Sequence, residues 1–205
     1  MLKYSDFDEN IKAFVFELDD VLLPVKDYDL QVYYLFSNFL EYLEPQIVAI
    51  ELMDFIKSRY EVENNHFMFE ELQLNFKIDK KYKANFELLF SNAKLPLKLL
   101  LYKATLELLQ EIVVNKKQIF ILTAGLPAIQ LNKIRQTEWH GLDKFLKVYF
   151  IDEFSPKPNS ASLDFLLNSN NLNKTETVFV GISVNDKLMA NNTGVNYLIC
   201  FKFKL

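Results

Sequence analysis

The chain has little cysteine and no long stretch of uncharged apolar residues. Its single cysteine, Cys200, excludes a disulfide within the chain, and the apolar run around it predicts a buried core thiol. The first residues have neither the basic start nor the apolar segment of a signal peptide. No charge-free apolar run approaches the length of a membrane span. These absences predict a soluble cytoplasmic protein that has no membrane partner.

Basic side chains are too few and too dispersed for a polyanion-binding surface. The chain has 23 Lys and Arg residues against 27 Asp and Glu residues, a formal net charge of -4. Its lysines lie among acidic residues, so no basic stripe is formed. Nucleic acid is therefore not an expected partner. Internal repeats and low-complexity segments are also lacking.

Hydrophobic residues make up half of the 205 residues, enough for one full core and a smaller accessory core. Short apolar runs have the composition of buried strands around residues 14–17, 118–122, 148–151, 178–180 and 197–201. Helix-like stretches alternate with the later runs, at residues 129–134, 160–167 and 187–191. This order predicts an α/β fold whose parallel sheet is wound by right-handed crossovers.

A long stretch without a comparable strand separates the first two predicted strands. Apolar residues recur there at helical spacing, in residues 35–43, 47–55, 67–76 and 82–90. Core packing explains its many aromatic residues better than a cofactor site does. We therefore expect an all-helical insertion at residues 25–96 and an α/β core formed by residues 1–24 and 97–205.

Polar residues follow four of the predicted strands. Glu17 and Asp19 come after the first strand, Thr123 ends the second, Lys157 follows the third, and Asp186 follows the fourth. The carboxyl ends of parallel strands face one crevice, which is where such folds bind ligands. The sequence thus predicts several carboxylates, a hydroxyl and an ammonium around one point.

With these four motifs in this order, the chain resembles the haloacid dehalogenase-like (HAD) hydrolase superfamily. It resembles in particular the phosphatases of that superfamily, which carry a helical cap inserted after the first strand. The resemblance covers about residues 12–200. It implies a Rossmann-like, doubly wound parallel sheet with an inserted helical cap. It also implies phosphoester hydrolysis through a carboxylate nucleophile, with Mg²⁺ as cofactor.

The resemblance assigns a role to each polar residue of the predicted crevice. Glu17 matches the nucleophile and Asp19 the acid/base, while Thr123 and Lys157 match the groups that bind phosphate. The metal ligands implied are Glu17, Asp19 and Asp186. Backbone N–H groups near Asp19 add to the expected phosphate cradle. The expected partner is phosphate or a small phosphorylated metabolite.

Two positions depart from the pattern of the superfamily. Glu17 stands where the nucleophile is ordinarily Asp, and its carboxylate lies about 1.5 Å further from the backbone. A misplacement near 1 Å costs on the order of 10²-fold in rate, roughly 3 kcal/mol of transition-state stabilisation. Ile182 replaces an Asp that would bind the metal, and it offers neither charge nor lone pair. Both changes affect the same nucleophile and metal unit, so we expect weak or no turnover.

Simpler interpretations of the same residues stay open at this point. In the simpler interpretation, the carboxylates after the first strand only form an acidic turn. Thr123 then caps the helix that begins near Pro127. Lys157 is then a surface lysine, and Asp186 is a solvated acid in the first turn of a helix. The alternative function is a non-catalytic family member that binds a phosphorylated ligand or a protein partner. Haloacid dehalogenation, which needs no magnesium, is a third candidate function.

Overall fold

The computed structural model describes residues 3–63 and 68–200, and these form two compact units. The first unit contains the chain up to Val25, residues Leu99–Gln130 and the chain from Thr137 onward. The second contains Lys26–Lys98 together with Leu131–Gln136. The helix α6 (Pro127–Gln136) therefore contributes residues to both units. We describe each unit by itself.

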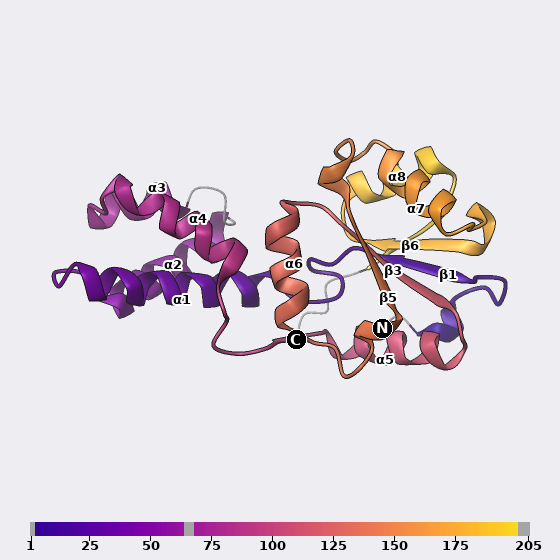
Figure 1. Ribbon diagram of the computed structural model, residues 1–205, viewed down its shortest axis with the longest axis horizontal. Coiled ribbons are helices and arrows are strands. Elements are labelled where there is room, and N and C mark those ends of the chain that lie inside the picture. Colours follow the sequence, from indigo (N-terminus) through magenta and orange to yellow (C-terminus); the bar gives the residue numbers. More distant parts are fainter. Residues whose placement is uncertain (1–2, 64–67, 201–205) are drawn as a thin grey trace. The chain divides into compact units, whose positions relative to one another are not determined.

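A parallel sheet forms the centre of the first unit, in the strand order β5-β3-β1-β6-β7 (Figure 1). Its strands are β1 (Ala13–Phe16), β3 (Gln118–Thr123), β5 (Leu146–Phe150), β6 (Thr177–Gly181) and β7 (Asn196–Ile199). The central strands β1 and β6 are buried along their whole length, which explains their uninterrupted apolar sequences. This sheet confirms the predicted α/β fold class.

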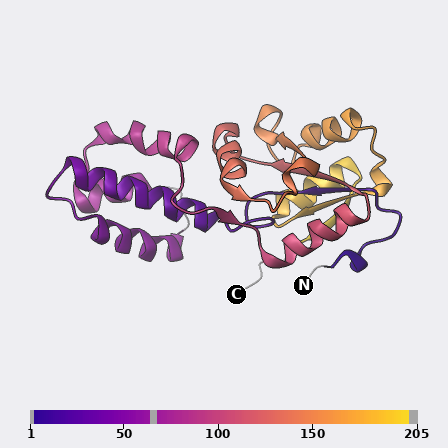
Figure 2. The ribbon, with the colours of Figure 1, turned by 60° about the horizontal axis from the view of Figure 1, so that its bottom comes forward.

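Helices cover both faces of this sheet, with α5 (Lys103–Val114) on one face and α7 (Ala161–Ser169) and α8 (Val184–Thr193) on the other (Figures 1 and 2). Because side chains alternate along a strand, Val15 packs in the core cluster with α7 and α8, whereas Phe16 lies near Leu108 of α5. α8 begins with a capping box at Ser183 and ends at Gly194, whose φ of +83° is left-handed.

Short elements complete the first unit. β2 (Leu99–Leu100) and β4 (Thr137–Glu138) form a separate parallel pair. The 3-10 helices here are η1 (Tyr4–Asp6), η3 (Asp143–Phe145), η4 (Ile151–Glu153) and η5 (Lys174–Glu176). Neither the strand pair nor helix α5 was predicted from the sequence. The spacing of Ala104, Leu108 and Ile112, all buried in α5, was the available signal.

The second unit is helical throughout its described residues. It contains α1 (Val25–Leu43), α2 (Ala49–Glu63), α3 (Met68–Phe76), η2 (Lys80–Tyr82) and α4 (Lys83–Asn92), and in Figure 2 α1 lies between α2 and the other two. Its core is aromatic, and Phe36 contacts the rings of Phe39, Phe69 and Phe86. The four predicted helical segments are confirmed, except that Phe67 lies outside the described residues.

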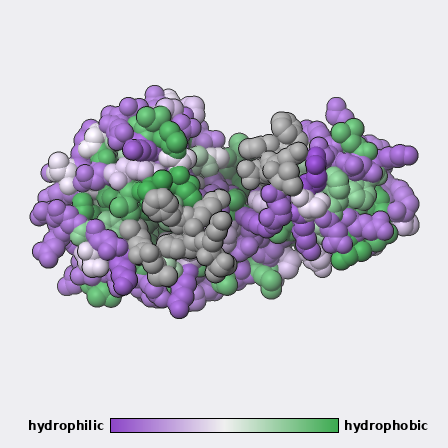
Figure 3. All heavy atoms as spheres, turned by 180° about the vertical axis from the view of Figure 1, so that it is seen from behind, coloured by the Kyte–Doolittle hydropathy of each residue, from purple (hydrophilic) through white to green (hydrophobic). Residues whose placement is uncertain are grey.

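The surface of the helical unit is largely hydrophilic on the face that Figure 3 shows, with hydrophobic residues in small groups. Among the described residues, no helix combines the length and apolar character that a membrane crossing needs. The predicted boundaries of the insertion stay a prediction. The inclusion of Leu131–Gln136 in the helical unit was not foreseen, because those residues follow β3 in the sequence.

Candidate active site

The register of the sheet brings the predicted polar residues to one edge. Phe16 of β1 pairs with Ile121 of β3 and with Val180 of β6, so the residues that follow these strands meet at the same level. The N–H of Glu17 continues the ladder by donating to the carbonyl of Val180 at 3.0 Å. Thr123, the last residue of β3, is fully buried. The strand ends therefore assemble a polar cluster inside the first unit.

Glu17 is buried and all of its carboxylate is engaged. Its side chain is 7% exposed, and Oε2 forms an ion pair with the ammonium of Lys157. Oε1 accepts a hydrogen bond from the N–H of Leu18 at 3.0 Å, and the hydroxyl of Thr123 also hydrogen-bonds to this carboxylate. Burial raises the pKa of Glu17, and this effect outweighs the charge and hydrogen bond of Lys157, which lower it.

Asp186 is turned toward its own helix terminus as well as toward the cluster. Oδ2 accepts hydrogen bonds from the N–H groups of Ile182 (2.9 Å) and Ser183 (2.8 Å), and Oδ1 pairs with Lys157. Burial acts to raise its pKa, but Lys157 and the two N–H groups outweigh it, so the pKa is lowered. The helix-terminus interpretation of Asp186 is right about its place in the first turn of α8 and wrong about solvation, because the side chain is 1% exposed.

Lys157 is the common partner of these two carboxylates. Its side chain is 12% exposed, and its ammonium contacts both Glu17 and Asp186. Burial acts to lower its pKa, but the two acidic partners outweigh burial, so the pKa is raised and the amine stays protonated. The interpretation of Lys157 as a surface lysine is therefore wrong.

Gln130 joins the cluster, although no role was predicted for it. Its amide nitrogen donates to Asp19 Oδ2 at 3.0 Å, to Thr123 Oγ1 at 2.9 Å and to the carbonyl of Ala124. Its Oε1 is buried and has no hydrogen-bond partner among the described residues. Rotating the amide would place that oxygen against a carboxylate and a carbonyl, so the orientation is determined by the acceptors. The signal in the sequence was its place in the first turn of a helix that follows a site strand.

A tight loop follows β1 and positions Asp19. One backbone N–H that was expected in the phosphate cradle forms a hydrogen bond within this loop instead. The carbonyl of Leu18 accepts hydrogen bonds from Leu22 (3.0 Å) and Leu23 (3.3 Å). Asp20 has a left-handed φ of +59°, and its N–H donates to the carbonyl of Leu23 at 2.8 Å. That N–H is therefore committed to the loop and does not serve the phosphate cradle predicted from the sequence.

The donors present do not fit a magnesium ion as they are arranged. Mg²⁺ requires nearly octahedral oxygen ligands, usually including one or two carboxylates with free oxygens. Here Lys157 is paired with both Glu17 and Asp186, the second oxygen of Asp186 is held by two N–H groups, and position 182 is Ile. Within residues 3–63 and 68–200, no three His, Cys, Asp or Glu side chains are grouped to hold a metal. The magnesium predicted from the sequence therefore has no preformed site in this arrangement.

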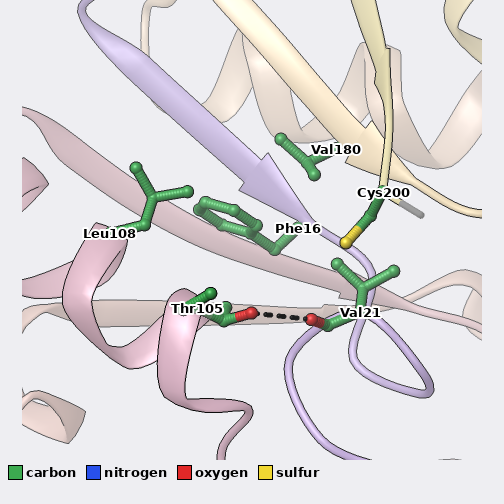
Figure 4. A pocket seen from close by; sticks show the side chains of 7 residues that line it. Phe16, Val21, Thr105, Leu108, Val180 and Cys200 are labelled. Carbon is green, nitrogen blue, oxygen red and sulfur yellow. Dashed lines mark hydrogen bonds between the residues drawn. The ribbon is translucent and has the colours of Figure 1, made fainter. Parts of the chain in front are cut away.

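Cys200 lies near the strand ends but belongs to an apolar environment. It follows β7, and its thiol points into a cavity of about 10 Å³ together with Phe16 and Val21 (Figure 4). Thr105 donates its hydroxyl to the carbonyl of Val21 beside this cavity, at 3.1 Å. Burial raises the pKa of the thiol, which keeps it protonated and unreactive. The predicted buried core thiol is confirmed.

Solved structures share this fold at low sequence identity. The HAD-hydrolase YfnB from Bacillus subtilis, bound to magnesium, is 14% identical, with a TM-score of 0.63 and coverage of 91% of this chain and 85% of that one. The defluorinating L-2-haloacid dehalogenase Rha0230 is 13% identical (TM-score 0.61, coverage 94% and 82%). A HAD family hydrolase from Deinococcus radiodurans, with bound phosphate and sodium, is 14% identical (TM-score 0.58, coverage 94% and 81%).

Sequence comparison gives the family. No curated protein sequence matches the chain. The sequence model of the haloacid dehalogenase-like hydrolases matches residues 14–200, which is nearly the whole chain and includes every strand of the main sheet except one residue of β1. The chain therefore belongs to the haloacid dehalogenase-like hydrolase family.

Proposed function

We propose that this protein is a phosphatase-like HAD family member of the helical-cap branch whose turnover of small phosphoesters is weak or absent. The observation that carries the proposal is the state of the nucleophile position. Glu17 is held by Lys157 through one oxygen and by the N–H of Leu18 through the other. The position that would supply a further metal ligand carries Ile182.

The chemistry of phosphoryl transfer explains why this arrangement is unfavourable. The attacking carboxylate must approach phosphorus in line with the leaving group, and negative charge on the transferred group must be neutralised. In this cluster Glu17 and Asp186 share the ammonium of Lys157. An incoming phosphate would have to compete with both carboxylates for that ammonium, which opposes its binding.

The positions of several residues support the proposed phosphatase ancestry. Thr123 ends β3 beside Glu17, and Lys157 carries the positive charge that would hold a phosphoryl oxygen. Asp19, the counterpart of the acid/base, is held through one oxygen by Gln130. The degenerate positions are thus Glu17 and Ile182, and the rest of the machinery supports descent from a working phosphatase.

The second candidate function is a non-catalytic family member that binds a phosphorylated ligand or a protein partner. The engagement of both oxygens of Glu17 favours it, because a binding function needs no free nucleophile. The two candidates differ in whether any bond of the ligand is broken. Phosphate release distinguishes them.

The test measures phosphate release from a panel of small phosphoesters, with and without magnesium. The proteins compared are the wild type, Glu17→Asp, Ile182→Asp and the double variant. We expect little or no release by the wild type and the highest release by the double variant, because it restores both the shorter nucleophile and the metal-binding acid. A 2-haloacid panel under the same conditions tests dehalogenation.

Two outcomes would contradict the proposal. Magnesium-dependent release by the wild type at ordinary phosphatase rates would show that Glu17 and Asp186 build a working site. No release by any of the four proteins, with each of them folded, would argue against a phosphatase ancestry and favour the binding function. Halide release by the wild type would assign the chain to the dehalogenase chemistry instead.

A further inference from the structure

The ammonium of Lys157 supplies the positive charge that two buried carboxylates share. It forms ion pairs with Glu17 after β1 and with Asp186 in the first turn of α8. These carboxylates come from segments far apart in the sequence, and both are at least nine-tenths buried. Buried carboxylates require a counter-charge or full hydrogen bonding, because removing a charge from water is costly.

The remaining oxygens of both carboxylates are already used. Asp186 Oδ2 accepts the N–H groups of Ile182 and Ser183, and Glu17 Oε1 accepts the N–H of Leu18. A Cβ at position 181 would lie 2.7 Å from the Cβ of Asp186, so the glycine there leaves room for this side chain. The two N–H groups hold the carboxylate of Asp186 in the orientation in which it receives Lys157.

We propose that Lys157 is the resident cation of this crevice, replacing a divalent metal, so that the native protein binds no Mg²⁺ or Mn²⁺ there. A metal ion entering the site would have to displace the ammonium from two carboxylates and would leave a buried charge unpaired. Ile182 adds no ligand that would favour this exchange. The inference concerns metal binding, so it holds whether or not the protein hydrolyses phosphoesters.

The proposal makes a specific prediction for a variant that lacks the ammonium. In Lys157→Met the carboxylates of Glu17 and Asp186 have lost their counter-charge, and a divalent cation is the simplest replacement. This variant should therefore bind Mn²⁺ at least about tenfold more tightly than the wild type does. Adding Glu17→Gln to it should remove the gained binding.

Electron paramagnetic resonance of Mn²⁺ measures free metal directly and does not depend on activity. We expect the wild type to leave the free Mn²⁺ signal unchanged at millimolar metal, and Lys157→Met to reduce it. Lys147→Met is the matched control, because Lys147 is an exposed lysine of the same unit whose ammonium donates to Asn170. This control should behave as the wild type does.

Any of three results would overturn the proposal: binding by the wild type that Glu17→Gln removes, equal binding by Lys157→Met and the wild type, or equal gains in Lys157→Met and Lys147→Met. If Lys157→Met does not fold, Lys157→Gln replaces it. Its neutral amide can still donate hydrogen bonds to the carboxylates, and the same gain of Mn²⁺ binding is expected. The first of the three results needs only the wild type and Glu17→Gln, and not the Lys157 variants.

Discussion

Two ion-pair sites, one in each unit of this protein, differ greatly in their exposure. In the α/β unit, the ion pairs of Lys157 with Glu17 and Asp186 are buried at the ends of the strands. In the helical unit, ion pairs such as that of Lys83 with Glu70 lie at the surface, at about 40% exposure or more, around an aromatic core. The same pairing of an ammonium with a carboxylate should therefore contribute differently to stability at the two sites.

This difference teaches where to look for function in the chain. Exposed ion pairs contribute little to stability, since water already solvates their charges. A buried charged cluster is seldom the most stable way to fill a core, because apolar residues of similar volume often do as well or better. Its presence at the strand ends of a HAD-like fold favours a functional origin, whereas the exposed pair of Lys83 and Glu70 needs no such explanation.

Removing the shared ammonium should have the largest effect on stability. Lys157→Met leaves Glu17 and Asp186 buried without their counter-charge, and we expect a loss of about 3–5 kcal/mol in the free energy of unfolding. Urea unfolding at neutral pH without divalent cations measures it. The matched control Lys83→Met removes an exposed pair and should cost much less. Similar losses in both variants would remove the contrast between the units.

The helical unit should respond most strongly to a change in its apolar core. Leu40 of α1 is fully buried in the cluster around Phe36 and Phe69, and Leu40→Ala should cost about 3 kcal/mol through lost burial and a residual cavity. Urea unfolding followed by circular dichroism measures this loss. The exposed Leu74→Ala in α3 serves as the control and should change stability by less than about 0.5 kcal/mol. A small effect of Leu40→Ala would show that the aromatic core does not carry the stability of this unit.

Crowding at the end of β6 should produce a smaller loss. Gly181→Ala places a Cβ 2.7 Å from the Cβ of Asp186 and 2.8 Å from its Oδ2, so the side chain of Asp186 or the backbone must shift. We expect a cost of about 2 kcal/mol, as for other overpacked sites. Thermal unfolding measures it, and combining Gly181→Ala with Asp186→Ala, which relieves the crowding, should give less than the sum of the two single losses. Additive losses would mean that the two residues do not interact.

The two partners of Lys157 should give pH dependences of opposite sign. The folded pKa of Asp186 lies below its ordinary value of 3.8, so its stabilisation is present above pH 3.8 and is lost as the pH falls through the folded pKa. The pKa of Glu17 in the folded state lies above its ordinary value of 4.5, so the folded state retains this proton at a pH where the unfolded state has lost it. Stability therefore falls as the pH rises from 4.5 to the folded pKa.

Urea unfolding from about pH 3 to about pH 7 measures both contributions, as differences between the wild type and each single variant. Relative to Asp186→Asn, the wild type should gain stability as the pH rises. Relative to Glu17→Gln, it should lose stability as the pH rises above 4.5. Differences of the same sign for the two variants would contradict the assignment of Asp186 as the carboxylate that retains its charge.

Much of the fold could be predicted from local patterns. Strands buried on both faces give continuous apolar runs, and β1, β3 and β6 were recognised on that basis within one or two residues. The third predicted strand was placed too late, because β5 begins at Leu146 and the chain has entered η4 by Ile151. β5 is a half-buried edge strand, so its sequence pattern is weaker.

The sequence predicted which residues form the candidate site better than it predicted which of them contact one another. The strand ends identified Glu17, Thr123, Lys157 and Asp186, and these are brought together. Gln130 received no role, because its contacts with Asp19 and Thr123 depend on how α6 packs after β3. No local pattern encodes the direction of a side chain that reaches across a loop.

The sequence by itself determined the chemistry available to this protein: a parallel sheet with carboxylates, a hydroxyl and an amine at its strand ends, and two substitutions at Glu17 and Ile182. Only the tertiary structure decided that Lys157 pairs with both Glu17 and Asp186, and that Gln130 reaches Asp19 and Thr123. The physical reason is burial. In water each of these groups would be solvated separately, whereas at a buried strand end each charge is stable only with the partner that the fold brings to it.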